Sequence, residues 1–205
     1  MFYCIMVPLA WLVWHLAFRI KVVGRENIVR DRPVVIICNH LSAIDPVFLI
    51  LARFWGKRMI ILAKEELFQK PFPRWFLLHV GVIPIGRGKG DTGTIDKVIA
   101  EVKGGRTALI FPEGTRSKDG SLQRLKSGAF VVAQQAGADI LPARIIYRGG
   151  KMRVFHRATV VFGKCIPLEE LGLTGEEHSA AVLRGAKARV TAELEKLLEE
   201  NREYC

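Results

Sequence analysis

The chain has 205 residues, of which 50% are hydrophobic, and it carries a net charge of +11 with a pI of about 9.8. Its length suits one domain with a sizeable core, and its charge indicates an anionic partner: nucleic acid, a phosphorylated metabolite or an anionic membrane. The cysteines and histidines are scattered, with no C-x-x-C pair and no metal-ligand spacing, so neither a disulfide framework nor a metal site is expected.

Residues 1–18 are almost wholly apolar, and no charged residue precedes Arg19. A helix of this length spans roughly 27 Å, just short of the hydrocarbon core of a bilayer. The segment lacks the positive n-region and cleavage site of a secretory signal, and Lys21 and Arg25 follow it, which favours a cytoplasmic location for the rest of the chain. We therefore expect residues 1–20 to associate with the cytoplasmic face of the cell membrane, crossing it or half-embedded in it. A helix packed on the domain's own core is the alternative.

Residues 22–27 predict a short strand and turn, and the apolar run 34–38 predicts a buried strand. Pro46 predicts a helix that begins there and runs to about residue 55. Asp45 then occupies the N-cap position. The intervening loop can fold back so that the Asp45 carboxylate meets the His40 imidazole, which fixes the ring and leaves its other nitrogen free as a general base. In the alternative interpretation, Asp45 only caps the helix.

Further short strands are predicted at 59–63 and 81–85. The segment 64–78 mixes aromatic and basic residues, which suits anionic lipid headgroups, single-stranded nucleic acid, or a core helix with solvated basic edges. The turn 86–90 is rich in glycine and basic, and it is a candidate phosphate cradle although it matches neither a P-loop nor a dinucleotide fingerprint. A helix over 94–103 follows.

A buried strand at 107–111 leads into a polar stretch at 112–117. Ligands of open α/β sheets bind at the carboxyl ends of strands, and this stretch and His40 both follow strands. Lys126 precedes a helix predicted over 129–136, whose first backbone N–H groups favour an anion.

The C-terminal part of the chain is predicted to add strands at 140–147, 152–155 and 158–162, followed by an amphipathic helix from 175 to about 204. No repeat or linker interrupts this pattern. The sequence therefore predicts an α/β domain over 21–205, with a single mixed β-sheet flanked by helices.

Four stretches in this order resemble the glycerolipid acyltransferase family, specifically the 1-acylglycerol-3-phosphate (lysophosphatidate) acyltransferases. Residues 40–45 match its His-x4-Asp motif, and 81–87 resemble its Gly-x-x-x-Ile-x-Arg block. Residues 111–117 match Phe-Pro-Glu-Gly-Thr-Arg-Ser at every position, and 140–143 resemble its apolar-Pro strand. The third motif is highly specific, and the resemblance covers the chain from about residue 25 to residue 162.

The resemblance implies a glycerol-phosphate acyltransferase-like fold and transfer of an acyl chain to the free sn-2 hydroxyl of 1-acylglycerol-3-phosphate, giving phosphatidate. The donor is a thioester, acyl-CoA or acyl carrier protein, and no other cofactor is implied. His40 is the expected general base and Asp45 its orienting partner. Glu113 and Thr115 are expected to order the acceptor glycerol and to brace Arg116. The residues expected to bind substrate are Asn39, Lys64, Arg87, Glu113, Gly114, Thr115, Arg116 and Lys126. Arg87, Arg116 and Lys126 are expected to bind the acceptor phosphate. Lys64 or loop N–H groups are candidates for stabilising the oxyanion of the tetrahedral intermediate.

Two other functions are compatible with the sequence. The acceptor could be glycerol-3-phosphate or another lysophospholipid, or the chain could be a non-catalytic basic module that binds membranes. Nucleic acid is not the expected partner, because it does not explain a His–Asp pair and Glu-Gly-Thr-Arg-Ser at successive strand ends. A covalent acyl-enzyme on Ser42 or Cys38 is disfavoured, because Cys38 lies in a buried strand and Ser42 is only two residues from His40.

Overall fold

One mixed β-sheet organises the fold in a computed structural model that describes residues 2–53, 59–69, 71–79, 82–85, 92–175 and 179–205. Within these ranges seven strands pair in the order β1-β7-β6-β2-β5-β3-β4. The strands are β1 (Arg19–Val23), β2 (Val35–Cys38), β3 (Ile60–Lys64), β4 (Val82–Ile85), β5 (Ala108–Ile110), β6 (Ile140–Tyr147) and β7 (Arg157–Phe162). The predicted α/β fold with a single mixed sheet is confirmed.

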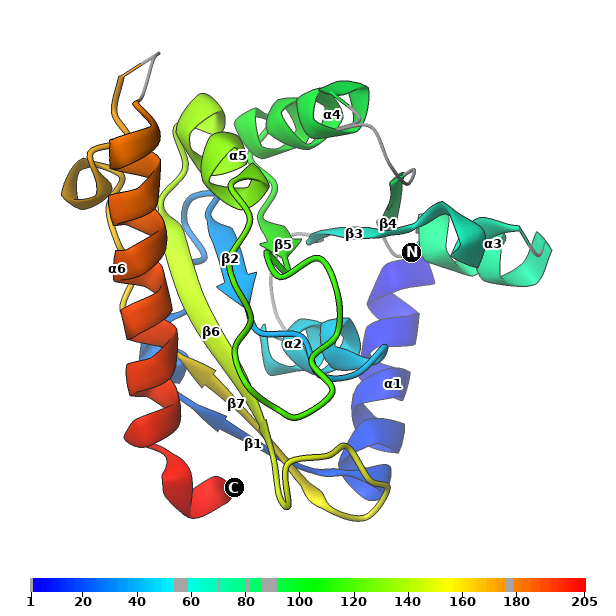
Figure 1. Ribbon diagram of the computed structural model, residues 1–205. Coiled ribbons are helices and arrows are strands. Elements are labelled where there is room, and N and C mark those ends of the chain that lie inside the picture. The colour runs from blue at the N-terminus through cyan, green and yellow to red at the C-terminus, as the bar shows by residue number, and fades with distance from the viewer. Residues whose placement is uncertain (1, 54–58, 70, 80–81, 86–91, 176–178) are drawn as a thin grey trace.

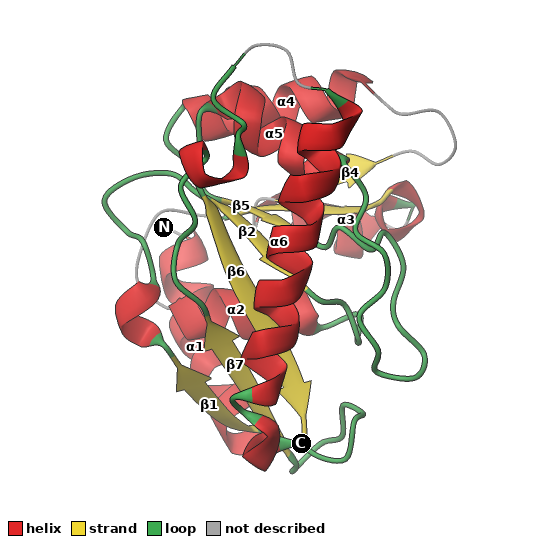
Figure 2. Ribbon diagram, turned by 60° about the vertical axis from the view of Figure 1, so that its left-hand side comes forward, coloured by secondary structure: helices red, strands yellow, loops and turns green. Residues whose placement is uncertain are grey.

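Helices cover both faces of the sheet (Figures 1 and 2). The helices are α1 (Phe2–Ala17), α2 (Asp45–Arg53), α3 (Pro71–His79), α4 (Thr92–Lys103), α5 (Gly128–Ala136) and α6 (Ala180–Glu199), with 3₁₀ turns η1 (Arg25–Asn27), η2 (Glu65–Phe68), η3 (Glu169–Leu171) and η4 (Arg202–Tyr204). Buried residues of α4, α5 and α6 form the core on one face, and the end of α1 packs with α2 on the other. Alternate residues of β2 belong to the two cores, and burial on both faces explains why this strand is a continuous apolar run.

Strand directions place the candidate residues at one edge of the sheet. The strands from β6 to β4 in the sheet order run parallel to one another, whereas β7 is antiparallel to β6 and parallel to β1. The carboxyl ends of β2, β5 and β6 therefore share one edge, as the α/β pattern predicts.

Three predicted elements differ from the observed ones. Residues 152–155 lie in the loop between β6 and β7 rather than in a strand. The first strand is Arg19–Val23, so it begins earlier than the strand and turn expected over 22–27. The last helix begins at Ala180 rather than at the predicted residue 175. The Ser179 hydroxyl caps this helix by accepting the Val182 N–H at 3.3 Å.

Helix α1 is apolar on both of its sides, so it is not amphipathic. Just beyond its last turn, Phe18 packs edge-to-face on Phe48 of α2, with ring centroids 5.1 Å apart. A stripe on the other side is about half exposed or more and consists of Leu9, Leu12, Val13 and Leu16. The expected helix is thus present, and its end packs on the core as the alternative interpretation required. Among the described helices, none is both long and apolar enough to cross a membrane.

Candidate functional site

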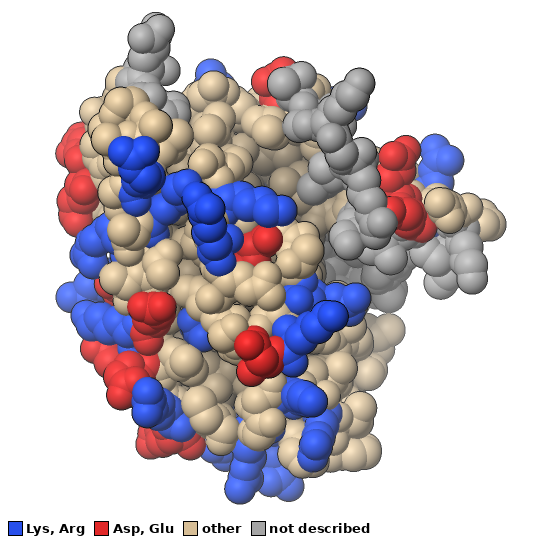
Figure 3. Space-filling view, viewed as in Figure 1, with Lys and Arg blue, Asp and Glu red and all other residues tan. Residues whose placement is uncertain are grey.

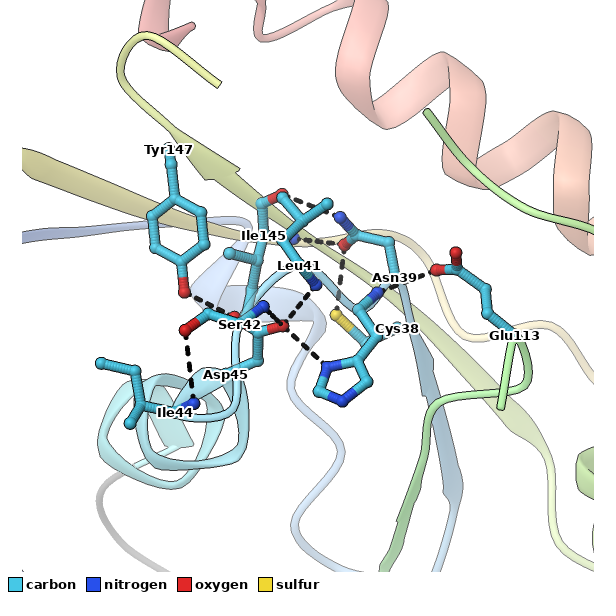
Figure 4. A network of polar contacts seen from close by, with 10 residues as sticks. Cys38, Asn39, Leu41, Ser42, Ile44, Asp45, Glu113, Ile145 and Tyr147 are labelled. Carbon is cyan, nitrogen blue, oxygen red and sulfur yellow. Dashed lines mark hydrogen bonds and ion pairs between the residues drawn. The ribbon is translucent and has the colours of Figure 1, made fainter. Parts of the chain in front are cut away.

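The loop between β2 and α2 folds back on itself around one carboxylate (Figure 4). Asp45 is fully buried, and its Oδ2 accepts the N–H groups of Leu41 at 2.6 Å and Ser42 at 2.8 Å. The same oxygen lies 2.9 Å from Nδ1 of His40, whose side chain is 20% exposed. The structure therefore brings together the two side chains that were expected to pair, with the imidazole at the surface and the carboxylate beneath it.

Asp45 does not act as the predicted N-cap. Helix α2 begins at Asp45 itself, whose own N–H donates to the Ser42 carbonyl at 3.1 Å. Its carboxylate points back toward the loop rather than to the first N–H groups of the helix. Oδ2 of Asp45 instead meets three partners in the loop, the N–H groups of Leu41 and Ser42 and the ring of His40. These contacts outweigh the preference of Asp for the N-cap position.

Tyr147, the last residue of β6, completes this arrangement and was missed in the sequence. Its hydroxyl donates to Oδ1 of Asp45 at 2.5 Å, and the residue is 3% exposed. Burial and the adjacent carboxylate raise the pKa of Tyr147, so the phenol stays protonated and remains a donor. The available signal was that a strand beside β2 ends in an aromatic residue with a polar tip.

Tyr147→Phe tests whether this hydrogen bond positions Asp45. A hydrogen bond to a charged acceptor is worth about 2 kcal/mol, so we expect a loss of stability of that order. We also expect kcat to fall about tenfold with little change in KM, since the phenol orients Asp45 and does not contact substrate. Steady-state kinetics and urea denaturation check this, and a change confined to KM would contradict it.

The motif at 111–117 holds the backbone of His40 from both sides. The His40 N–H donates to Oε1 of Glu113 at 2.8 Å, and the Ser117 N–H donates to the His40 carbonyl at 2.8 Å. Phe111 stacks on the His40 ring with centroids 4.3 Å apart. The motifs at 40–45 and 111–117 are therefore joined by direct contacts. In this arrangement Phe111 and Ser117 position His40, a role that the sequence did not reveal.

Glu113 braces this structure through both of its oxygens. Its Oε2 accepts the Gln123 N–H at 3.1 Å, and the residue is 3% exposed. Burial raises the pKa of the carboxyl, while the N–H groups of His40 and Gln123 oppose that shift. The expected contact with Arg116 is not found, since no ion pair joins the two within the described part of the chain. Glu113 thus holds the backbone of His40, and its contact with the acceptor glycerol stays a prediction.

Asn39 also has a structural partner that was not anticipated. Its Nδ2 donates to the Ile145 carbonyl at 3.1 Å, and its Oδ1 accepts the Ile145 N–H at 2.8 Å. The side chain thus extends the pairing of β2 with β6, and the residue is 1% exposed. The amide is thus buried and bonded to the neighbouring strand, and the contact of Asn39 with substrate stays a prediction.

The remaining residues of the motif lie at the surface beside His40. Gly114 has φ +72°, a backbone conformation that favours glycine, and the flexible end of the Lys126 side chain lies beside it. The Thr115 hydroxyl donates to Gln123 Oε1 at 3.1 Å. Arg116 and Lys126 are exposed. Two exposed cations therefore belong to the segment that holds the backbone of His40, and their contact with an anionic acceptor stays a prediction.

Two predicted residues are not tested by the structure. Arg87 and the turn 86–90 that contains it fall outside the described ranges. Lys64 ends β3 at the same edge of the sheet, but its side chain is not among those described.

The alternative nucleophiles are poorly placed. Cys38 is completely buried, and burial raises the pKa of its thiol well above the ordinary value, which disfavours the thiolate. The Ser42 hydroxyl accepts the Ile44 N–H at 3.4 Å, and no hydrogen bond joins it to His40. In the described part of the chain no group of three His, Cys, Asp or Glu side chains is arranged to hold a metal ion.

The chain is similar to known proteins in both sequence and fold. A family model described as Acyltransferase matches residues 19–146, which is more than half of the chain. The chain belongs to this acyltransferase family. The matched region contains β1 through most of β6 and hence all the site residues described above except Tyr147, which follows it directly.

Curated relatives in this acyltransferase family share part of their length with the chain. It is 34% identical over 144 residues to the 1-acyl-sn-glycerol-3-phosphate acyltransferase of Borreliella burgdorferi, covering 69% of this chain and 55% of that protein. It is 33% identical over 171 residues to the protein of the same name from Saccharomyces cerevisiae, covering 79% and 55%. The chain thus spans about half the length of these relatives.

A crystal structure of the acyltransferase PlsC from Thermotoga maritima, described as a 1-acyl-sn-glycerophosphate (LPA) acyltransferase, has the same fold. The TM-score is 0.70 with 24% sequence identity, and the match covers 97% of this chain and 78% of that one. The architecture of this chain is therefore that of a solved acyltransferase.

Proposed function

We propose that the protein transfers an acyl chain from a thioester to the sn-2 hydroxyl of 1-acylglycerol-3-phosphate, producing phosphatidate for phospholipid synthesis. The observation that carries the proposal is the 2.9 Å contact of His40 Nδ1 with the buried Asp45 carboxylate. Family membership and the names of the relatives favour this acceptor. The donor is acyl-CoA or acyl carrier protein.

The pair suits general base catalysis. With Nδ1 donating to Asp45, Nε2 is the ring nitrogen left to take the proton of the acceptor hydroxyl as its oxygen attacks the thioester carbonyl. The carboxylate stabilises the imidazolium that forms. When the tetrahedral intermediate collapses, the C–S bond breaks and the imidazolium returns its proton to the departing thiolate. The transfer is direct, with no acyl-enzyme.

The acceptor phosphate is assigned to Arg116 and Lys126, with Arg87 as a third cation. Arg116→Ala is expected to raise KM for lysophosphatidate by roughly tenfold to a hundredfold, the worth of a charge-assisted contact, and to change kcat only a few-fold. Arg106→Ala, at the opposite end of β5, removes a partly exposed ion pair with Glu101 and is the matched control. A large loss of turnover at saturating acceptor would contradict the binding role of Arg116.

We further propose that the protein acts at the cytoplasmic face of the cell membrane, as a monotopic protein. The exposed apolar stripe of α1 suits partial insertion in one leaflet. The net charge of +11 suits anionic lipid.

Acyl transfer by the purified protein in detergent tests the proposed reaction. Lysophosphatidate is offered with acyl-CoA and, in parallel, with acyl carrier protein thioester, and glycerol-3-phosphate and other lysophospholipids are compared as acceptors. Phosphatidate formation that is lost in a His40 variant would support the proposal and identify the donor. Preferred use of another acceptor would change the substrate but keep the chemistry. No product from any combination with folded protein would favour the non-catalytic membrane-binding module.

A further inference from the structure

The loop between β6 and β7, residues 148–156, exposes two apolar side chains. Val154 is 52% exposed and Phe155 is 75% exposed, the largest exposure of any large hydrophobic side chain in the described part of the chain. An isolated exposed aliphatic residue is ordinary, but an adjacent pair that includes an aromatic ring marks a contact surface.

This loop is held in place, so the exposure is imposed by the fold. At its base the Arg148 N–H donates to the Arg157 carbonyl at 3.2 Å, and Met152 packs against the core shared by α1 and α2. The Phe155 N–H donates to the carbonyl of Ala17 at 2.7 Å. Phe155 therefore lies beside the last turn of α1, where Leu16 is 73% exposed. The apolar side chains of the loop continue the exposed stripe of α1.

The backbone at the tip of the loop is strained. Phe155 has φ +65°, and within the described ranges it is the one non-glycine residue with a positive φ. A bulky residue in this conformation is unfavourable, and glycine would relieve it. The fold thus keeps a phenylalanine where neither packing nor backbone conformation calls for one, and such strain concentrates at functional sites.

Basic residues surround the two apolar side chains. No acidic residue occurs between 147 and 158, and the exposed cations of this segment are Arg148, Lys151, Arg153 and Arg157. In the register of β1 with β7, Arg19 and Arg157 are direct neighbours and both are exposed, a pairing of like charges that an anion would stabilise. Figure 3 shows Lys and Arg side chains gathered at the lower edge, where Figure 1 places this loop.

We propose that the loop 148–156 is a second membrane contact, which inserts Val154 and Phe155 into the interfacial region of an anionic bilayer while its cations bind lipid phosphates. Apolar tips flanked by cations and continuous with the apolar stripe of α1 fit a lipid surface better than a protein or nucleic acid partner. The loop begins after Tyr147, which holds Asp45, so this contact sets the distance of His40 from the membrane. The proposal extends the proposed membrane location and does not depend on the acyl-transfer reaction.

Phe155→Gly separates membrane contact from folding. The full chain is sedimented with phosphatidylcholine vesicles that contain phosphatidylglycerol. We expect the variant to be at least as stable as the wild type, because glycine suits the positive φ, yet to bind vesicles roughly tenfold more weakly, the effect of withholding one aromatic side chain from the membrane. Val154→Ser should also weaken vesicle binding, and it leaves the strained residue Phe155 unchanged.

A second comparison tests the cations. Lys151→Ala with Arg153→Ala should weaken binding to the phosphatidylglycerol vesicles by roughly twenty-five-fold, since each charge near an anionic surface is worth about fivefold. Binding to pure phosphatidylcholine should change little. Lys97→Ala with Lys103→Ala on α4, both exposed, removes the same charge elsewhere and is expected to have a much smaller effect.

Wild-type affinity for vesicles in Phe155→Gly and Val154→Ser would overturn the proposal, and so would equal effects of the two double charge variants. Turnover of lysophosphatidate in detergent is read in parallel and should be unchanged in the loop variants. A wild type that binds vesicles through this loop but forms no phosphatidate would sustain the inference and reject the proposed function.

Discussion

His40→Ala is expected to lower kcat by roughly 10²–10⁴-fold, the contribution typical of a positioned general base. The fold should survive, because the side chain is partly exposed and its loss leaves Asp45 with the N–H groups of Leu41 and Ser42 and the hydroxyl of Tyr147. The loss of the ring contact with Phe111 should cost about 1 kcal/mol.

The measurement is acyl transfer in detergent at saturating acceptor, with the midpoint of thermal unfolding recorded for the same preparations. His156→Ala, which removes an exposed imidazole from the loop 148–156, is the matched control and should keep wild-type turnover in detergent. More than a tenth of wild-type kcat in a folded His40→Ala protein would exclude His40 as the base.

Asp45→Ala is expected to destabilise the whole domain. The partly buried N–H groups of Leu41 and Ser42 and the buried hydroxyl of Tyr147 would all lose their acceptor. Each buried donor left unpaired costs about 1–3 kcal/mol, so the total approaches the entire stability of a typical domain. We expect much of the protein to be unfolded or insoluble at 37 °C, and urea denaturation at lower temperature measures the loss.

Asp45→Asn separates the structural from the catalytic part of this role. The amide oxygen can still accept the loop N–H groups, and the amide nitrogen can donate to the Tyr147 hydroxyl, so most of the stability should remain. The negative charge that stabilises the imidazolium is lost, and kcat should fall by roughly 10²–10⁴-fold. An Asp45→Ala protein within about 1 kcal/mol of the wild type would contradict the network in Figure 4.

Local sequence patterns predicted the elements around His40 and Asp45 correctly, but not every role of the residues in them. The apolar run before His40 and the Pro after Asp45 predicted a strand, a loop and a helix, and all three are present at nearly the expected residues. The N-cap prediction for Asp45 was wrong, because capping preference describes one helix end and ignores the donors that a folded loop supplies. Local propensity also failed at 152–155, where docking on α1 overrides an extended pattern.

The partner of Tyr147 could not be predicted from local patterns, since Asp45 is 102 residues away in the chain. The same reason applies to Asn39, whose partner on β6 is 106 residues away, and to Glu113, which bonds to the backbone of His40 rather than to the Arg116 of its own motif. A buried polar group takes whichever partner the fold brings to it, and spacing along the chain does not predict that partner.

The amino-acid sequence determined the fold class, the order of most strands and helices, and the two motifs at strand ends, because these depend on local periodicity and on which residue types chemistry requires. Only the tertiary structure decided which of these side chains stay exposed and which brace the site. Parallel pairing of β2 with β5 and β6 brings three distant strand ends to one edge, and desolvation there commits Asn39, Glu113 and Tyr147 to internal hydrogen bonds. The cations Arg116 and Lys126 stay exposed, and the imidazole of His40 stays partly exposed.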